Sequence, residues 1–154
     1  LMHATFLQIL LGALVAGIDA GRAFPTWPLM GESFFPADAF YVPDGGGLWR
    51  AFFENPGLVQ FLHRMTGYLI LAFGIVVWLK GRRSVHPRTK AAFDLVGAML
   101  LVQVVLGIFT VIHAAPLHLG LAHQAGAIVL FTLILRARHR ALYPIVTSLR
   151  GQIQ

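Results

Sequence analysis

The sequence predicts an all-α integral membrane protein: an antiparallel bundle of four transmembrane helices with a long outer loop between helices one and two. Three observations predict this fold class. The 154-residue chain is 57% hydrophobic with only 12% charged residues, about half the charged share of soluble domains. Its mean hydropathy is +0.73. Four apolar runs approach the roughly 20 residues that a membrane-spanning helix needs.

The four predicted spans cover about residues 4–18, 57–79, 91–112 and 117–135. Prolines precede the second and fourth runs, and proline favours the first turn of a helix. The length suits one four-helix unit, so we expect a single domain over residues 1–154. The first run begins at Leu1 without a positively charged segment before it. This start is atypical of a signal peptide, and we expect the chain to continue a longer one.

The loop charges predict the topology. Segment 80–90 contains five basic residues and no acid, and the tail 136–154 contains four arginines and no acid. Segment 19–55 instead contains five acids and two arginines. Basic loops face the cytoplasm or matrix, so we expect the loop 80–90 and both termini inside, and the loop 19–55 outside. Within that outer loop, Leu48–Phe53 is predicted to form a short amphipathic helix on the membrane surface.

Composition excludes several classes of function. The chain has no cysteine, which excludes disulfides, thiolate metal sites and iron–sulfur clusters. The net charge of +6 would suit nucleic acid in a soluble protein. In a chain this apolar, it indicates the inner membrane face instead, and we expect no nucleic-acid partner.

Two histidines are the main candidates for chemistry. His63 and His123 each follow a helix-opening proline, Pro56 or Pro116, by seven residues. At about 1.5 Å per residue, both imidazoles lie roughly 10 Å into their helices. The predicted topology brings both helices in from the outer side as diagonal partners in the bundle. Two imidazoles that converge at one depth are suited to bind a haem iron from both faces.

Other interpretations of the pair stay open. Each histidine could instead be buried separately and bonded to its neighbours. Zinc and copper sites generally use three or four ligands, often with a carboxylate, and no acid lies in a span near His63 or His123.

Neighbouring residues extend the candidate site. Gly67 lies one turn after His63, and Gly126 and Ala127 lie one turn after His123. These small residues would leave a flat space for a porphyrin, or would serve close helix packing. Two polar residues flank His63. Gln60 would bond a haem substituent or a bundle neighbour, and Arg64 would pair with a propionate or reach the outer surface.

The sequence resembles the C-terminal half of the haem A synthases, membrane enzymes of cytochrome oxidase assembly. The segments that carry the resemblance occur in order along nearly the whole chain: Gly17–Gly21, Phe24–Gly31, Phe53–Pro56, Val59–Arg64, Leu106–Thr110 and Ala122–Gly126.

The resemblance implies an eight-span oxidoreductase built from two similar four-helix halves, each with a histidine pair. The enzyme oxidises a methyl group of haem O to the formyl group of haem A. The N-terminal half holds the substrate and a Glu-x-x-His-Arg motif. The C-terminal half holds a haem b that passes electrons. By this resemblance His63 and His123 are haem b ligands, and the partners are membrane lipid, an unknown electron donor and an N-terminal half or second copy.

One position departs from the catalytic motif. The sequence reads Gln60–Phe61–Leu62–His63–Arg64, so a glutamine stands where the catalytic half would have glutamate. A carboxamide does not ionise and cannot take a proton as a carboxylate does. We therefore expect no catalytic residue in this chain and place it as the cofactor half.

Two other functions compete with this one. A stand-alone membrane cytochrome b for electron transfer would use the same histidines. A structural or assembly protein without a cofactor would need neither histidine. We expect a bacterial plasma membrane, with the mitochondrial inner membrane as the alternative.

Overall fold

The computed structural model of this chain describes residues 1–43, 45 and 47–144. Residues 44, 46 and 145–154 lie outside the described part, and they include Asp44 of the predicted outer loop and Arg150 of the predicted inner tail. The described part is helical and contains no strand, only an isolated bridge between Met30 and Ser33.

Three helices are long and apolar enough to cross a membrane: α3 (Pro56–Gly81), α4 (Pro87–Ile112) and α5 (Leu117–Leu142). Each has 26 residues, about 39 Å at the α-helical rise, against a hydrocarbon core of about 30 Å. Few residues in their most apolar windows are buried inside the protein, between 11% and 17%. Long helices that expose apolar side chains on most faces are those of an integral membrane protein.

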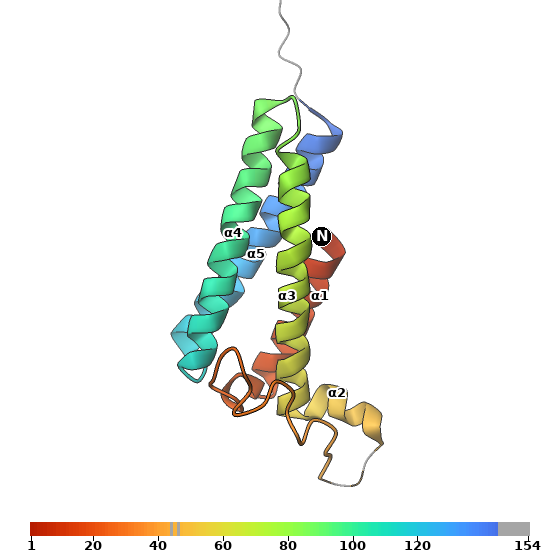
Figure 1. Cartoon of the computed structure of the whole chain (residues 1–154), viewed down its shortest axis with the longest axis vertical. Helices are drawn as coiled ribbons and strands as arrows, with labels where there is room; N and C mark the ends of the chain where they lie inside the picture. The colour runs from red at the N-terminus through yellow and green to blue at the C-terminus, as the bar shows by residue number, and fades with distance from the viewer. Residues whose placement is uncertain (44, 46, 145–154) are drawn as a thin grey trace, which may run out of the picture.

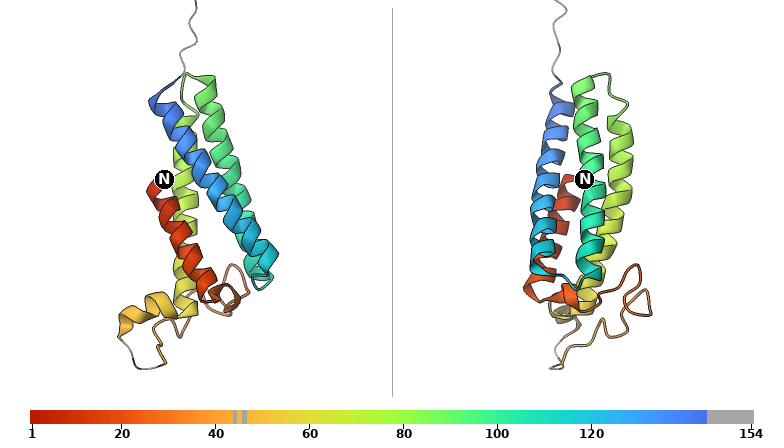
Figure 2. Two further views of the ribbon diagram at one scale, coloured as in Figure 1. Left: turned by 180° about the vertical axis from the view of Figure 1, so that it is seen from behind. Right: turned by 90° about the vertical axis from the view of Figure 1, so that its left-hand side faces the viewer.

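The first helix, α1 (Met2–Gly17), has 16 residues and is shorter than a full membrane span. It lies beside the long helices in Figure 1 and begins about midway along the bundle. The α1 helix contacts α3 and α5, and α4 contacts the same two helices. Figure 2 shows this arrangement from two further sides. Helices α3 and α5 therefore face each other across the bundle.

The helix starts follow from local sequence. Asn55 caps α3, because its side-chain Oδ1 accepts a hydrogen bond from the Leu58 amide at 2.9 Å, and Pro56 occupies the first turn. Pro87 likewise opens α4, so this helix begins before residue 91, where hydropathy alone placed the span. At its other end, α5 continues through the arginines of the predicted inner tail to Leu142.

The larger of the two buried hydrophobic clusters in the described residues lies in the half of the bundle away from the outer loop. Its members come from α3, α4 and α5: Ile70, Ala92, Val96, Leu100, Leu130, Ile134 and Ala137. Large apolar side chains on the same helices point outward instead, and Leu69, Leu101 and Ile128 are between 59% and 69% exposed. Exposed apolar area on this scale requires an apolar surrounding.

The loop between α1 and α3 contains three short helical segments, η1 (Ala20–Arg22), η2 (Leu48–Arg50) and α2 (Ala51–Glu54). The last two occupy the predicted helical segment Leu48–Phe53. Its location on a membrane surface stays a prediction.

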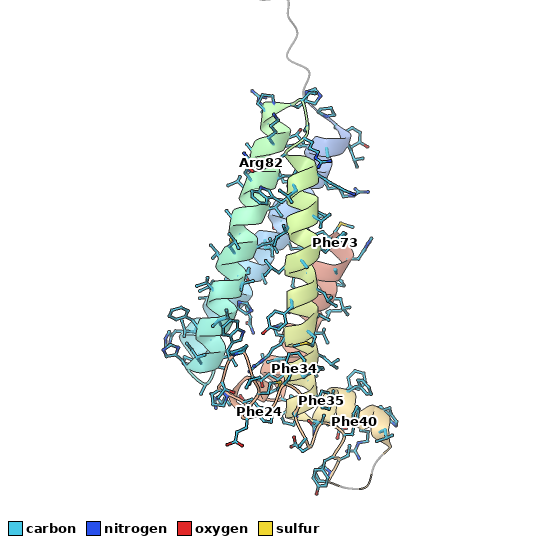
Figure 3. All side chains as sticks on the ribbon, in the orientation of Figure 1. Phe24, Phe34, Phe35, Phe40, Phe73 and Arg82 are labelled. Carbon is cyan, nitrogen blue, oxygen red and sulfur yellow. The ribbon has the colours of Figure 1, made fainter. Side chains whose placement is uncertain are left out.

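Aromatic contacts attach this loop to the first turns of α3. The Phe61 ring lies 4.9 Å from that of Phe35 and 5.8 Å from that of Phe34, centroid to centroid. Phe24, Phe34, Phe35 and Phe40 gather at the same end of the bundle in Figure 3, far from Arg82 at the opposite end. The loop is thus anchored at the end of α3 that carries His63.

Candidate functional site

The structure brings the two predicted histidines together. His63 extends from α3 and His123 from α5, the two helices that face each other across the bundle. Their ring centroids lie 6.4 Å apart and their planes are nearly perpendicular, at 87°. Both side chains are partly buried. The two histidines that each follow a proline by seven residues are therefore neighbours in space.

Each ring retains a buried nitrogen without a partner. The Nδ1 atoms of His63 and His123 are both buried and have no hydrogen-bond partner among the described residues. An unpartnered buried polar atom is costly. Such an atom in a native protein calls for a ligand, an ion or a water.

The spacing of the rings suits one metal atom between them. An imidazole nitrogen binds a metal at about 2 Å, and the ring centre lies roughly 1 Å behind that nitrogen, so two rings on opposite sides of one ion have centroids about 6 Å apart. The observed 6.4 Å agrees with this value. No group of three or more histidine or acidic side chains that could hold a metal occurs in the described part of the chain. A six-coordinate haem iron takes four nitrogens from the porphyrin and needs only two ligands from the protein. The two imidazoles present therefore fit that group.

Two glycines that the sequence did not single out contact the rings. A Cβ atom added to Gly12 of α1 would lie 3.2 Å from His63 Cε1, and one added to Gly107 of α4 would lie 3.2 Å from His123 Cε1. Side chains at these positions would displace the rings. The sequence signal was available, since both glycines follow a glutamine by four residues within a span.

Gln8 of α1 is a neutral polar residue within a span, and it forms the interhelical hydrogen bonds expected of such a residue. Its Nε2 donates to the His63 backbone carbonyl at 2.9 Å and lies 3.4 Å from His63 Nε2. Its Oε1 accepts a hydrogen bond from the Thr66 hydroxyl. Gln8 thus links α1 to the turn of α3 that carries His63.

The predicted site residue Gln60 contacts the outer loop. It is only 3% exposed, and its Nε2 donates to the carbonyls of Gly21 at 3.3 Å and Phe24 at 3.4 Å. Its Oε1 is buried and has no partner in the described residues. Of the two interpretations of this amide, bonding to a neighbouring segment matches its contacts.

The predicted site residue Arg64 also binds the loop. Its Nη2 donates to the Phe24 carbonyl at 2.8 Å and its Nη1 to the Leu29 carbonyl at 3.2 Å. Gln60 and Arg64 together hold the segment around Phe24 against α3. In this arrangement both side chains position the loop beside the histidine turn.

The predicted glycines make room for glutamine side chains. A Cβ atom at Gly67 would lie 3.3 Å from Gln8 Nε2, and one at Gly126 would lie 2.1 Å from Gln103 Nε2. The flat space predicted beside each histidine is therefore occupied by an amide in this structure. Close packing between helices is the role that these contacts support.

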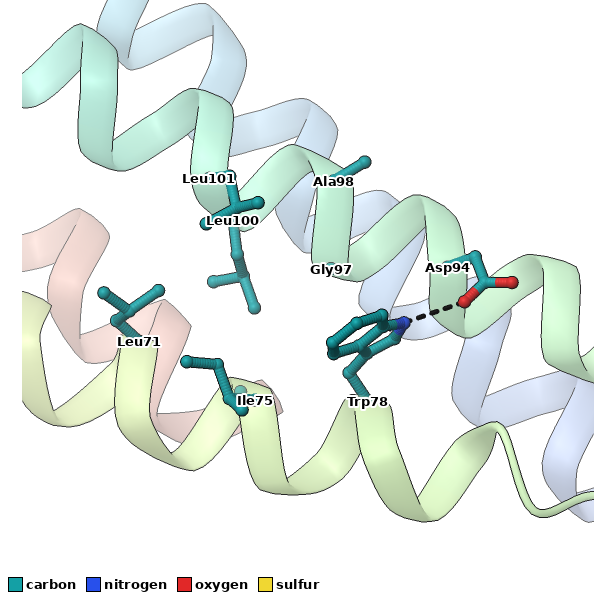
Figure 4. A pocket seen from close by; sticks show the side chains of 9 residues that line it. Leu71, Ile75, Trp78, Asp94, Gly97, Ala98, Leu100 and Leu101 are labelled. Atoms are coloured by element: carbon teal, nitrogen blue, oxygen red, sulfur yellow. Dashed lines mark hydrogen bonds between the residues drawn. The ribbon is translucent and has the colours of Figure 1, made fainter.

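A separate cavity of about 390 Å³ lies between α3 and α4, and Figure 4 shows its lining. Its walls are almost entirely apolar, and its one acid, Asp94, accepts a hydrogen bond from Trp78 Nε1 at 2.8 Å and pairs with Arg82 at 3.3 Å. The residues that line it are Leu71, Gly74, Ile75, Trp78, Asp94, Gly97, Ala98, Leu100 and Leu101. Since its only acid is already paired, we place the candidate site at the histidines.

Comparison with known proteins identifies the family of this chain. The family model of the cytochrome oxidase assembly proteins COX15-CtaA matches residues 1–135. The chain belongs to this family. The haem A synthase of Paracoccus denitrificans is 59% identical to this chain over 154 residues. The match covers 100% of this chain and 40% of the relative. The haem A synthases of Roseobacter denitrificans and Dinoroseobacter shibae are each 56% identical, over 98% and 99% of this chain and 39% of each relative.

The chain thus spans about 40% of the length of the curated haem A synthases that it matches. No solved structure matches it. The resemblance to this family expected from the motifs is confirmed. The roles of the individual site residues stay predictions.

Proposed function

We propose that this chain is the haem-b-binding part of a haem A synthase and that His63 and His123 are the two axial ligands of the haem iron. The observation that carries the proposal is the ring pair itself, 6.4 Å apart on facing helices with an unpartnered nitrogen on each ring. The relatives are named haem A synthases. Their cofactor would therefore be a haem.

A bound haem b supplies one-electron redox chemistry. The residues of this chain hold it and shape its surroundings. His63 and His123 each contribute one neutral nitrogen, and the apolar helices exclude water around them. With both histidines holding it, the haem would serve electron transfer.

The oxidation of the haem O methyl group takes place elsewhere in the complete enzyme. Gln60 stands in the position of the motif's glutamate and donates its amide to loop carbonyls, and a carboxamide takes no proton. The catalytic carboxylate would come from an N-terminal four-span half, because a second copy of this chain carries the same glutamine. The electron donor to the haem b is a further, unidentified partner.

The finer membrane arrangement is part of the proposal. Helix α1 is a membrane span as well as α3, α4 and α5. The four helices form one antiparallel bundle surrounded by lipid. The basic loop between α3 and α4 and both termini lie inside, and the loop anchored by Gln60 and Arg64 lies outside. The membrane would be a bacterial plasma membrane, since the relatives compared come from bacteria.

The proposal is tested by absorption and EPR spectra of the full-length protein purified from membranes. The wild type is expected to show a six-coordinate, low-spin b-type haem, and His63→Ala and His123→Ala are each expected to lose it. Retention of the wild-type spectrum in both variants would refute the ligand assignment.

A stand-alone cytochrome b is the alternative function, because the same ring pair serves electron transfer without haem O. Haem O conversion by the full-length protein separates the two. Conversion that depends on His63 supports the synthase. A low-spin haem in a protein that converts no haem O, even with an N-terminal half supplied, favours the cytochrome. A protein that takes up no haem would be structural.

A further inference from the structure

A short sequence unit occurs twice in the bundle. Residues Gln8–Gly12 of α1 read Gln-Ile-Leu-Leu-Gly, and residues Gln103–Gly107 of α4 read Gln-Val-Val-Leu-Gly. Residues four apart lie on one face of a helix, so each glutamine sits one turn from its glycine. Helices α1 and α4 occupy corresponding places, because each contacts both α3 and α5.

The glycine of each unit touches one histidine ring at the same atom. A Cβ atom at Gly12 would lie 3.2 Å from His63 Cε1, and one at Gly107 would lie 3.2 Å from His123 Cε1. This separation is tighter than ordinary van der Waals contact. By contrast, Gly17 of α1 and Gly120 of α5 have nothing within 4 Å of such an atom.

The glutamine of each unit fills the gap beside a small residue on the histidine helix. Gln8 Nε2 packs on Gly67 and also donates to the His63 carbonyl. Gln103 Nε2 packs on Gly126 of α5, and this side chain is 8% exposed with no hydrogen-bond partner for Nε2 in the described part of the chain. Each unit therefore contacts its histidine helix at two consecutive turns.

We infer that the two Gln-x-x-x-Gly units are positioning elements that set the orientation of the two imidazole rings. Gly12 sets the ring of His63 and Gly107 that of His123, and together they hold the near-perpendicular arrangement at 87°. Gln8 holds the backbone turn that carries His63, and Gln103 packs against the turn after His123. The inference rests on the proposed function in one respect: the rings it orients are taken as the two ligands of one haem.

The g-values of a low-spin ferric haem depend on the angle between its two axial imidazole planes. They therefore report ring orientation without requiring activity. Alanine favours a helix over glycine, so the replacements below add one methyl group without weakening the helix. That methyl must push the ring, or be pushed by it, by a few tenths of an ångström.

The experiment compares EPR spectra of the full-length holoprotein for Gly12→Ala and Gly107→Ala with the matched controls Gly17→Ala and Gly120→Ala. The first two variants are expected to keep haem at the wild-type ratio while their largest g-value shifts. The controls are expected to match the wild type. Unchanged g-values in Gly12→Ala and Gly107→Ala, or equal shifts in the controls, would overturn the inference.

A second measurement does not depend on haem. In haem-free protein with ¹⁵N-labelled histidine, Gly12→Ala is expected to move the ring signals of His63, and Gly107→Ala those of His123. Gln8→Met, which keeps the volume and removes the amide, is expected to act on His63. If the wild type binds no haem but these ring-specific shifts occur, the proposed function fails and the positioning role stands. If neither glycine variant moves its own ring, the positioning role is wrong whatever the haem content.

Discussion

Replacing Asn55 with alanine would detach the outer loop from the start of α3. The Asn55 side chain is buried, at 6% exposed. Its Oδ1 caps α3 by accepting from the Leu58 amide, and its Nδ2 donates to the carbonyls of Asp38 at 2.7 Å and Tyr41 at 3.1 Å. One side chain therefore joins the helix that carries His63 to two points of the loop.

The magnitude follows from these three bonds. Loss of an N-cap costs about 1 kcal/mol, and loss of each further hydrogen bond costs about 1 kcal/mol. Asn55→Ala is thus expected to destabilise the loop–helix junction by about 3 kcal/mol. Since every 1.4 kcal/mol is a factor of ten, local opening becomes roughly 100-fold more frequent.

Hydrogen exchange measured by mass spectrometry in detergent or nanodiscs reports this opening. Peptides that cover Asp38–Tyr41 and the Leu58 amide should exchange faster in Asn55→Ala, while the centre of α4 should be unchanged. Asn55→Asp is the matched control, because a carboxylate still caps the helix but cannot donate. It should keep the protection of the Leu58 amide and lose that of the loop.

Two results would contradict this reasoning. Equal exchange in the wild type and Asn55→Ala would mean that the three bonds contribute nothing to the junction. Equal loss at the Leu58 amide in Asn55→Asp and Asn55→Ala would mean that the cap and the loop bonds cannot be separated.

Two further predictions concern the ends of α3. A Cβ atom at Gly81 would lie 2.1 Å from Phe93 Cγ, so Gly81→Ala should destabilise the protein by about 1–3 kcal/mol through overpacking. Thermal unfolding should show this loss, and Gly120→Ala, which meets nothing, should show none. Near the other end, the hydrogen bond from Arg50 lowers the pKa of Glu54. The pair therefore stabilises α2 at pH values above the ordinary carboxyl pKa of about 4.3. This stabilisation is lost as the pH falls through the lowered pKa. A carboxyl NMR titration should give a Glu54 midpoint below 4.3 that returns towards it in Arg50→Gln, and an unchanged midpoint would rule out the pair.

Hydropathy and helix-start signals were sufficient to predict α3, α4 and α5, because each helix is apolar on most faces and each begins at or directly after a proline. The pairing of His63 with His123 also followed from the sequence, because equal distances from two prolines translate directly into equal depth. The resemblance to the family, expected from the motifs, is confirmed as well.

The rotation of each helix about its own axis could not be predicted. A helix surrounded by lipid shows no continuous polar face, and the mark of the inward face on α1 and α4 is one glutamine each, Gln8 and Gln103. Gly12 and Gly107 were missed because a single polar residue is a weak signal of a face. The contacts of Gln60 and Arg64 with the outer loop were not predicted either, because that loop carries little regular structure and so leaves no periodic signal.

The two-helix organisation around the rings has a consequence for how the site assembles. Helices α1 and α3 bring His63 and its glycine, and α4 and α5 bring His123 and its glycine. The two helix pairs are connected by the short segment after Gly81, and they pack together through α3 with α4 and α1 with α5. Neither pair alone presents two facing rings, so the ring pair forms only when the two hairpins dock.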